Sequence, residues 1–182
     1  MVKKYQPIPN DPDFDAAARE MIARRNSKFS IWGWKDPRTS LFLHQWKRLI
    51  PDLKVVLLWR PCAEVVESLL DRARKDGDND VPTIGAVACW CAYNQSIVKF
   101  KKRWPADAIL IPVSALLAKD KEAMQLIQSR LCPALQYRTI GEVYKPSLLS
   151  SRSGTLWTRI ISHLYRVEAL ERELSRLSEI VV

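Results

Sequence analysis

The stretch Lys54-Val55-Val56-Leu57-Leu58-Trp59, which runs directly into Arg60-Pro61, decides the fold of this chain. Its apolar residues are continuous and do not alternate with polar ones, which predicts a strand that is buried on both faces. Strands of this kind belong to parallel sheets that carry helices on each side. The strand is expected to end at Arg60-Pro61, and the following residues predict a helix over Ala63–Lys75.

Further strands and helices alternate along the chain. Two more apolar runs predict strands at Phe29–Trp34 and Ala108–Pro112. Capping residues, prolines and apolar spacing predict helices at 13–25, 39–50, 83–103, 119–131 and 156–180, the first of them capped by Asp13 or Asp15. The expected fold class is therefore α/β, with a few-stranded, mostly parallel sheet flanked by helices. Residues 1–154 form the predicted α/β domain, in which 1–28 are an irregular lead-in and a helix, and 155–182 form a C-terminal amphipathic helix.

The predicted C-terminal helix carries an apolar stripe at 3-4-3-4 spacing: Val167, Leu170, Leu174, Leu177 and Val181. The stripe is typical of a coiled coil, although it covers only about two heptads. Two interpretations are open, because both bury the same side chains. The helix packs either on its own domain or on a second copy in a homo-oligomer.

The composition is that of a basic globular protein. Of the 182 residues, 29 are lysine or arginine and 20 are acidic, which gives a net charge of +9 and favours anionic partners. No recognisable nucleic-acid-binding module is present, so no specific nucleic-acid partner is expected. The apolar runs are too short to span a membrane, and no secretory signal is recognisable, so a cytoplasmic location is expected. The four cysteines show no zinc-like spacing, and no metal site is expected.

A candidate anion site follows the central strand. Ligands of open α/β sheets bind beyond the carboxyl ends of the strands, and Arg60 stands at such an end. Its guanidinium can bind a phosphate through two parallel hydrogen bonds, Ser68 can add a hydroxyl donor, and Arg72 lies one turn further along the predicted helix. Spacing alone favours the alternative, in which Arg60 pairs with Glu64 and Ser68 is an ordinary helix serine.

A second cationic turn, with Lys35 and Arg38, follows the predicted strand at 29–34. Both cations are expected near the same sheet edge as Arg60. The alternative is an ordinary surface arrangement in which Asp36 pairs with Arg38 or Lys35.

Four motifs together resemble bacterial members of the sulfotransferase family over roughly residues 29–150. They are Trp32-Gly33-Trp34-Lys35-Asp36-Pro37-Arg38-Thr39, the run from Arg60-Pro61 through Val65 and Ser68-Leu69 to Arg72, Trp90-x-x-Tyr93-Asn94, and the segment 111–117. The resemblance implies a P-loop-like, nucleotide-binding fold that uses 3′-phosphoadenosine 5′-phosphosulfate (PAPS) as co-substrate. It implies that Arg60 and Ser68 hold the 3′-phosphate and that Lys35 approaches the transferring sulfonate. The acceptor would be a small molecule or a glycan.

The sequence departs from the family in two places. The glycine-rich turn that grips the 5′-phosphosulfate is not recognisable in residues 1–10, and Arg152 within the cluster 150–155 is the alternative anion binder. The usual acidic turn is replaced by Ser114-Ala115-Leu116, and no convincing general base stands out. Asp36 and His44 are the candidates, with an ion pair of Asp36 and ordinary packing of His44 as the alternatives. Three hypotheses follow: a sulfotransferase, a catalytically inactive or truncated relative that binds or assembles, and a basic protein that binds nucleic acid or another anionic partner.

Overall fold

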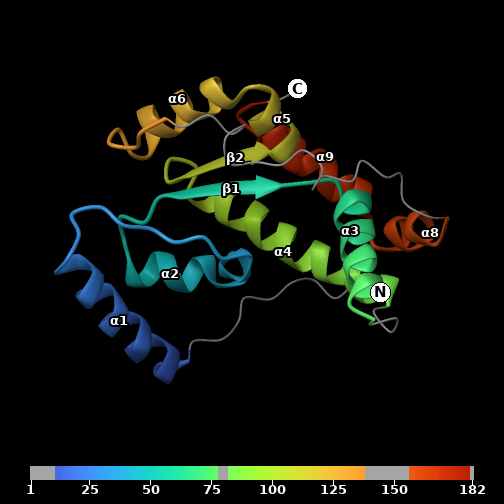
Figure 1. Ribbon diagram of the computed structural model, residues 1–182, viewed down its shortest axis with the longest axis horizontal. Coiled ribbons are helices and arrows are strands. Elements are labelled where there is room, and N and C mark those ends of the chain that lie inside the picture. Colours follow the sequence, from blue (N-terminus) through green and yellow to red (C-terminus); the bar gives the residue numbers. More distant parts are fainter. Residues whose placement is uncertain (1–10, 78–81, 138–155, 181–182) are drawn as a thin grey trace.

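The computed structural model describes residues 11–77, 82–137 and 156–180, and these build a mixed α/β fold (Figure 1). A small parallel sheet lies between helices. The elements in chain order are α1 (Pro12–Asn26), η1 (Pro37–Phe42), α2 (Leu43–Leu49), β1 (Val55–Trp59), α3 (Cys62–Lys75), α4 (Thr83–Arg103), β2 (Ala108–Pro112), α5 (Val113–Ala118), α6 (Asp120–Arg130), α8 (Leu156–Leu164) and α9 (Val167–Leu177).

The sheet of the described residues consists of β1 and β2, which pair in parallel with Val55 opposite Ala108 and Trp59 opposite Pro112. The prediction of both strands is confirmed. The chain passes from β1 to β2 through α3 and α4, as a parallel connection requires. Helix α4 spans the predicted residues 83–103, and its C-cap is Trp104, the residue before Pro105.

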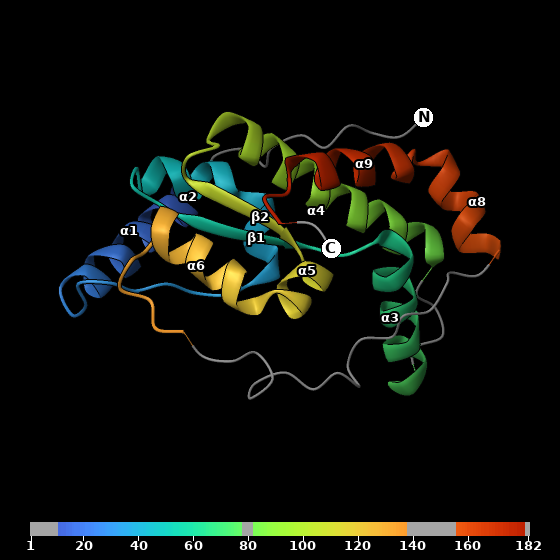
Figure 2. The same cartoon turned by 90° about the horizontal axis from the view of Figure 1, so that it is seen from above.

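The two faces of the sheet are covered to different extents. On one face, Leu57 and Leu110 pack with α4 and α9 in the larger core cluster. On the other, Ile109 and Ile111 pack with α5 and α6 (Figure 2). Val56 and Leu58 share this second face because they are paired with Ile109 and Ile111, yet their side chains are 40% and 43% exposed. The prediction that β1 is buried on both faces is therefore wrong, since α5 and α6 cover β2 and leave β1 open.

The predicted strand at Phe29–Trp34 is also wrong, because this segment is irregular. Its tryptophans are engaged in aromatic packing instead of a strand ladder. The Trp32 and Trp34 rings stack with centroids 5.7 Å apart, and Trp34 packs on Trp46 of α2 at 4.9 Å. Their indole N–H groups bond to Asn26 Oδ1 at 2.8 Å and to Thr39 Oγ1 at 3.0 Å. Lys35 and Arg38 consequently do not follow a strand.

Helix starts differ from the expectations in detail. Asp11 caps α1, where Asp13 or Asp15 was expected, and its carboxylate accepts the N–H of Asp13 at 2.9 Å. Asp36 caps the 3₁₀ helix η1, which replaces the first turn of the helix predicted at 39–50. Helix α5 was not predicted, because the segment after Pro112 was interpreted as a strand leading into a turn.

The C-terminal segment forms two helices where one was expected. Arg166 adopts the left-handed conformation with φ 53°, and this residue separates α8 from α9. The apolar stripe of α9 packs within the chain, since Val167, Leu170, Leu174 and Leu177 all belong to or contact the larger core. Val181 lies outside the described residues. Among the helices of the described part, none has the length and hydrophobicity to cross a membrane.

Candidate functional site

The turn after β1 holds Arg60 in a fixed position. The Arg60 carbonyl accepts the indole N–H of Trp90 from α4 at 3.0 Å, which ties the turn to the longest helix. Pro61 stands before the first residue of α3 with φ −51°, the value that its ring prefers. The Arg60 side chain is 19% exposed, so the guanidinium is largely enclosed and accessible from one side.

Arg60 is paired with Glu64, as the alternative interpretation of the spacing allowed. Arg60 Nε and Nη2 both donate to Glu64 Oε2, at 3.1 and 3.0 Å. Glu64, Ser68 and Arg72 follow one another at four-residue intervals and thus share one face of α3. Ser68 is half-buried and Arg72 is exposed. A phosphate that binds both the Arg60 guanidinium and the Ser68 hydroxyl would lie over Glu64. Cys62, the first residue of α3, and Ser68 are about 9 Å apart along the helix axis.

The N-terminus of α3 is already bound to a carboxylate. The N–H of Cys62 donates to Glu171 Oε1 of α9 at 2.7 Å. Burial raises the pKa of Glu171, and the nearby Glu168 and Glu64 raise this pKa further, whereas the hydrogen bond from Cys62 lowers it. Three carboxylates therefore gather at this helix start, where the partial positive charge of the helix favours an anion. These carboxylates would repel a phosphate that approaches the start of α3.

The second predicted turn forms a closed ion pair. Arg38 donates to Asp36 from Nε at 3.0 Å and from Nη2 at 2.7 Å, and its backbone N–H donates to the same carboxylate at 2.9 Å. The hydrogen bonds from the Arg38 side chain and backbone lower the pKa of Asp36 to about 2. Asp36 is therefore a weak base at neutral pH. Arg38 and Lys35 are exposed.

Helix α4 brings the two turns to neighbouring positions. Trp90 binds the Arg60 carbonyl, and Tyr93, one turn further along α4, interacts electrostatically with Arg38 and Asp36. Burial, the largest influence, raises the pKa of the Tyr93 phenol. Asn94, the third residue of the motif, is buried and donates to the Trp90 carbonyl at 2.8 Å within the helix. Of this motif, Trp90 is thus bonded to the Arg60 turn, and Tyr93 lies within electrostatic range of Asp36 and Arg38.

The other predicted site residues lie elsewhere. The ring of His44 packs on Trp104 at 5.0 Å and on Phe100 at 6.1 Å, near the C-terminal end of α4. Phe100 is ten residues from Trp90, about 15 Å along the helix, so the structure does not bring His44 to Arg60. Burial lowers the pKa of His44, with smaller contributions from Arg103 and Lys99. Arg152 and the cluster 150–155 lie outside the described residues.

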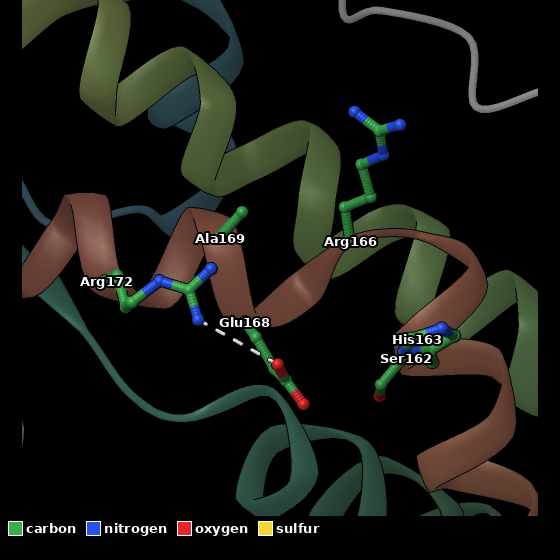
Figure 3. A pocket seen from close by; sticks show the side chains of 6 residues that line it. All are labelled: Ser162, His163, Arg166, Glu168, Ala169 and Arg172. Carbon is green, nitrogen blue, oxygen red and sulfur yellow. Dashed lines mark ion pairs between the residues drawn. The ribbon is translucent and has the colours of Figure 1, made fainter.

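A shallow cavity of about 210 Å³ opens where α8 meets α9 (Figure 3). Its lining residues are Ser162, His163, Arg166, Glu168, Ala169 and Arg172, and Arg172 forms a 3.8 Å ion pair with Glu168. None of the predicted site residues that lie within the described part of the chain lines this cavity. It is therefore separate from the Arg60 turn, although Glu168 belongs to the group of carboxylates near α3.

Sequence reasoning identified some partners of the site and missed others. Glu64 was foreseeable as an i+4 partner of Arg60. Glu171 was not, because it is 109 positions from Cys62 and lies in a segment whose pattern indicated only an amphipathic helix. Comparison of the chain with protein-family models, curated proteins and solved structures gave no match. Function is therefore inferred from the residues and their geometry alone.

Proposed function

We propose that this chain is a sulfotransferase-like nucleotide-binding protein, in which Arg60 and Ser68 hold the 3′-phosphate of PAPS or adenosine 3′,5′-bisphosphate. The observation that carries the proposal is the arrangement around α4. The Trp90 indole N–H donates to the Arg60 carbonyl at 3.0 Å, and further along α4 the Ser96 hydroxyl donates to the Ser40 carbonyl of η1, which follows Lys35 and Arg38, at 2.6 Å. Motifs that are far apart in the sequence thereby face one helix, and Arg60 follows the carboxyl end of a parallel strand, where α/β proteins bind ligands.

Binding of a phosphate at Arg60 requires an exchange of partners. The guanidinium is bonded to the Glu64 carboxylate, which carries one negative charge, whereas a phosphomonoester carries close to two at neutral pH. The phosphate also offers enough oxygens to accept from Arg60 and Ser68 together. We therefore expect binding that is favourable but weakened by Glu64, and removal of the Glu64 charge should strengthen it.

Transfer of sulfonate from PAPS to a small-molecule or glycan acceptor is the enzymatic form of the proposal. In that reaction, negative charge develops on the leaving phosphate, and fixed cations such as Lys35 and Arg38 would stabilise it. The exposed position of Lys35 permits this role.

A non-catalytic relative is the second candidate, and a specific observation favours it. The two candidate bases are poorly suited to accept a proton from an acceptor beside Arg60. The pKa of Asp36 is held at about 2, and His44 packs against the far end of α4. Such a relative would bind adenosine 3′,5′-bisphosphate and PAPS without turnover.

Isothermal titration with adenosine 3′,5′-bisphosphate tests the proposed pocket. Arg60→Ala should lose about 1.5–3 kcal/mol of binding free energy, the range for hydrogen bonds to charged groups, and Glu64→Gln should bind more tightly than the unmodified chain. Arg74→Ala is the matched control, because Arg74 lies on the same helix, is exposed and pairs with Asp71 at 3.0 Å. Adenosine 5′-monophosphate, which lacks the 3′-phosphate, should bind less tightly than the bisphosphate.

Two results would refute the proposal. One is the absence of any binding heat with the unmodified chain. The other is an equal loss of affinity in Arg60→Ala and Arg74→Ala, which would show that the chain attracts the nucleotide only through its net charge of +9.

A further inference from the structure

The outer edge of β2 carries a cluster of charged side chains around Glu179, which the chain reaches after α9 (Figure 2). The Glu179 carboxylate accepts the N–H of Leu110 at 2.8 Å, and its own N–H donates to the Leu110 carbonyl at 3.0 Å. Lys101 Nζ of α4 donates to this carboxylate and to the Ala108 carbonyl, the latter at 2.7 Å. Arg130 Nη1 of α6 donates to the carboxylate at 3.0 Å. Three donors from three elements thus converge on one acidic side chain, which closes this edge of the sheet.

Other bonds hold the three donors in position. Lys101 is buried and also donates to the Pro105 carbonyl at 3.2 Å. Arg130 Nη2 donates to the same carbonyl at 2.8 Å. The Leu110 N–H is fixed by β2, whose pairing with β1 leaves it on the outer side of the strand. Donors that are already oriented bind an anion without a further cost of ordering their side chains.

The cluster is accessible to solvent at two of its side chains. The Arg130 side chain is 34% exposed and the Glu179 side chain is 17% exposed, whereas Lys101 and Leu110 are buried. A ligand would therefore enter beside the Arg130 guanidinium, and the narrow access suits a small group. The cluster lies along β2 from its amino-terminal end to its middle, whereas Arg60 follows the carboxyl end of β1, so the two sites are separate.

The charges of the cluster do not balance within the described part of the chain. Two cations, Lys101 and Arg130, share one carboxylate, which leaves one positive charge uncompensated. Asp107, in the turn before β2, does not supply the missing negative charge, because it already pairs with Lys47 at 2.7 Å and with Lys54 at 2.6 Å. A group with two negative charges, in place of the single carboxylate, would balance the two cations.

We propose that this cluster is a binding site for the phosphate group of a phosphomonoester, which takes the place of the Glu179 carboxylate. The Glu179 side chain turns out toward solvent, and the phosphate oxygens accept from Lys101, Arg130 and the Leu110 N–H. A phosphomonoester carries close to two negative charges at neutral pH and offers three oxygens to these three donors. The backbone bond between Glu179 and Leu110 is kept, so the edge of the sheet stays closed. The inference does not rest on the proposed nucleotide site.

Nuclear magnetic resonance of the backbone amides gives the most direct test, because the Leu110 N–H would exchange a carboxylate for a phosphate. The probe is methyl phosphate, and dimethyl phosphate, which carries a single negative charge, is the matched control at equal ionic strength. Methyl phosphate should shift the Leu110 amide signal in a saturable way and should bind at least about tenfold more tightly than dimethyl phosphate. No saturable shift at Leu110, or equal affinity for the two esters, would overturn the proposal.

Variants of the cluster assign the phosphate to its donors. Glu179→Gln keeps an acceptor for the Leu110 N–H but removes the competing charge, so methyl phosphate should bind about tenfold more tightly. Arg130→Gln should weaken binding about tenfold, and it applies even if Glu179→Gln fails to fold, because Arg130 is partly exposed. Arg176→Gln is the matched control, since Arg176 of α9 is 73% exposed and should not affect the affinity.

Two results would assign the phosphate elsewhere. An equal loss of affinity in Arg130→Gln and Arg176→Gln would show that only the net charge of +9 attracts the ester, which would overturn the proposal. A loss in Arg60→Ala without a loss in Arg130→Gln would assign methyl phosphate to the Arg60 turn. That result would overturn the site at Glu179 and leave the proposed nucleotide site intact.

Discussion

Replacement of Lys101 by methionine should strongly destabilise the fold, because this buried ammonium closes one edge of the sheet. Lys101 is only 6% exposed, and its Nζ donates to the Pro105 carbonyl at 3.2 Å, to the Ala108 carbonyl at 2.7 Å and to the Glu179 carboxylate. Methionine fills a similar volume but donates no hydrogen bond. The replacement therefore isolates the polar contribution from the packing contribution.

The size of the effect follows from the groups that lose their partner. Ala108 is fully buried, so its carbonyl would lose its Lys101 donor without gaining water, which costs about 1–3 kcal/mol. Loss of one member of a buried ion pair costs about 3–5 kcal/mol, but Arg130 Nη1 also binds Glu179 at 3.0 Å and keeps part of that compensation. We expect Lys101→Met to lower the free energy of unfolding by about 3 kcal/mol.

Urea unfolding followed by circular dichroism measures this loss. Lys102→Met is the matched control, because Lys102 is the neighbouring lysine of α4 and is 49% exposed, so its ion pair with Glu173 should contribute less than about 1 kcal/mol. A double-mutant cycle with Glu179→Gln should give a coupling of about 1–3 kcal/mol. If Lys101→Met and Lys102→Met destabilise the chain to the same degree, the reasoning about the closed edge is refuted.

Two further predictions concern the group of residues at the start of α3. Burial raises the pKa of the Cys62 thiol to about 12, so Cys62 should resist a thiol reagent at about pH 8 until the chain unfolds. The exposed Cys89 should react at once. Mass spectrometry locates the modified residues, and rapid modification of Cys62 in the folded chain would contradict the structure. Glu171 has a raised pKa in the folded state, so its contribution to stability is fully present below the unfolded-state pKa and is lost as the pH rises through the folded-state pKa. Glu171→Gln keeps an acceptor for the Cys62 N–H and carries no charge, so it does not lose stability as the pH rises. The urea midpoint of Glu171→Gln should therefore exceed that of the unmodified chain by more at about pH 7 than at about pH 4. A difference in midpoint that grows toward pH 4 would contradict the raised pKa of Glu171.

Local sequence patterns correctly predicted the helices and strands whose structure depends on residues close together in the sequence. Helix α4 was predicted to the residue, because its apolar residues form a continuous helical run that ends before Pro105. Strands β1 and β2 were predicted because their apolar runs have the length of a strand and end at a proline-containing turn. The segment 29–34 has the same strand-like composition, but its tryptophans pack on each other and on Trp46. Aromatic residues serve both kinds of structure, so composition could not decide between them.

The candidate site could be predicted only as far as one element extends. The Arg60–Glu64 and Asp36–Arg38 pairs join residues within four positions, and both were foreseen as alternatives to ligand binding. The approach of Glu171 to Cys62 depends on how α9 packs against α4, and that packing depends on the turn at Arg166. A single left-handed residue within a helical pattern gives no clear signal in the sequence, because arginine does not favour this conformation.

The charge distribution around α3 bears on the ligand that the Arg60 turn can select. Although the chain carries a net charge of +9, the start of α3 is surrounded by the carboxylates of Glu64, Glu168 and Glu171. A singly charged anion gains little by replacing Glu64 at Arg60, because it exchanges one negative charge for another. A phosphomonoester brings nearly two charges and further acceptor oxygens, so under the proposed function it should compete better with Glu64 for Arg60 than a singly charged anion does. If the Arg60 turn binds the 3′-phosphate as proposed, Glu64 is the competitor that this phosphate must displace, and a singly charged sulfate ester or carboxylate should displace it less readily.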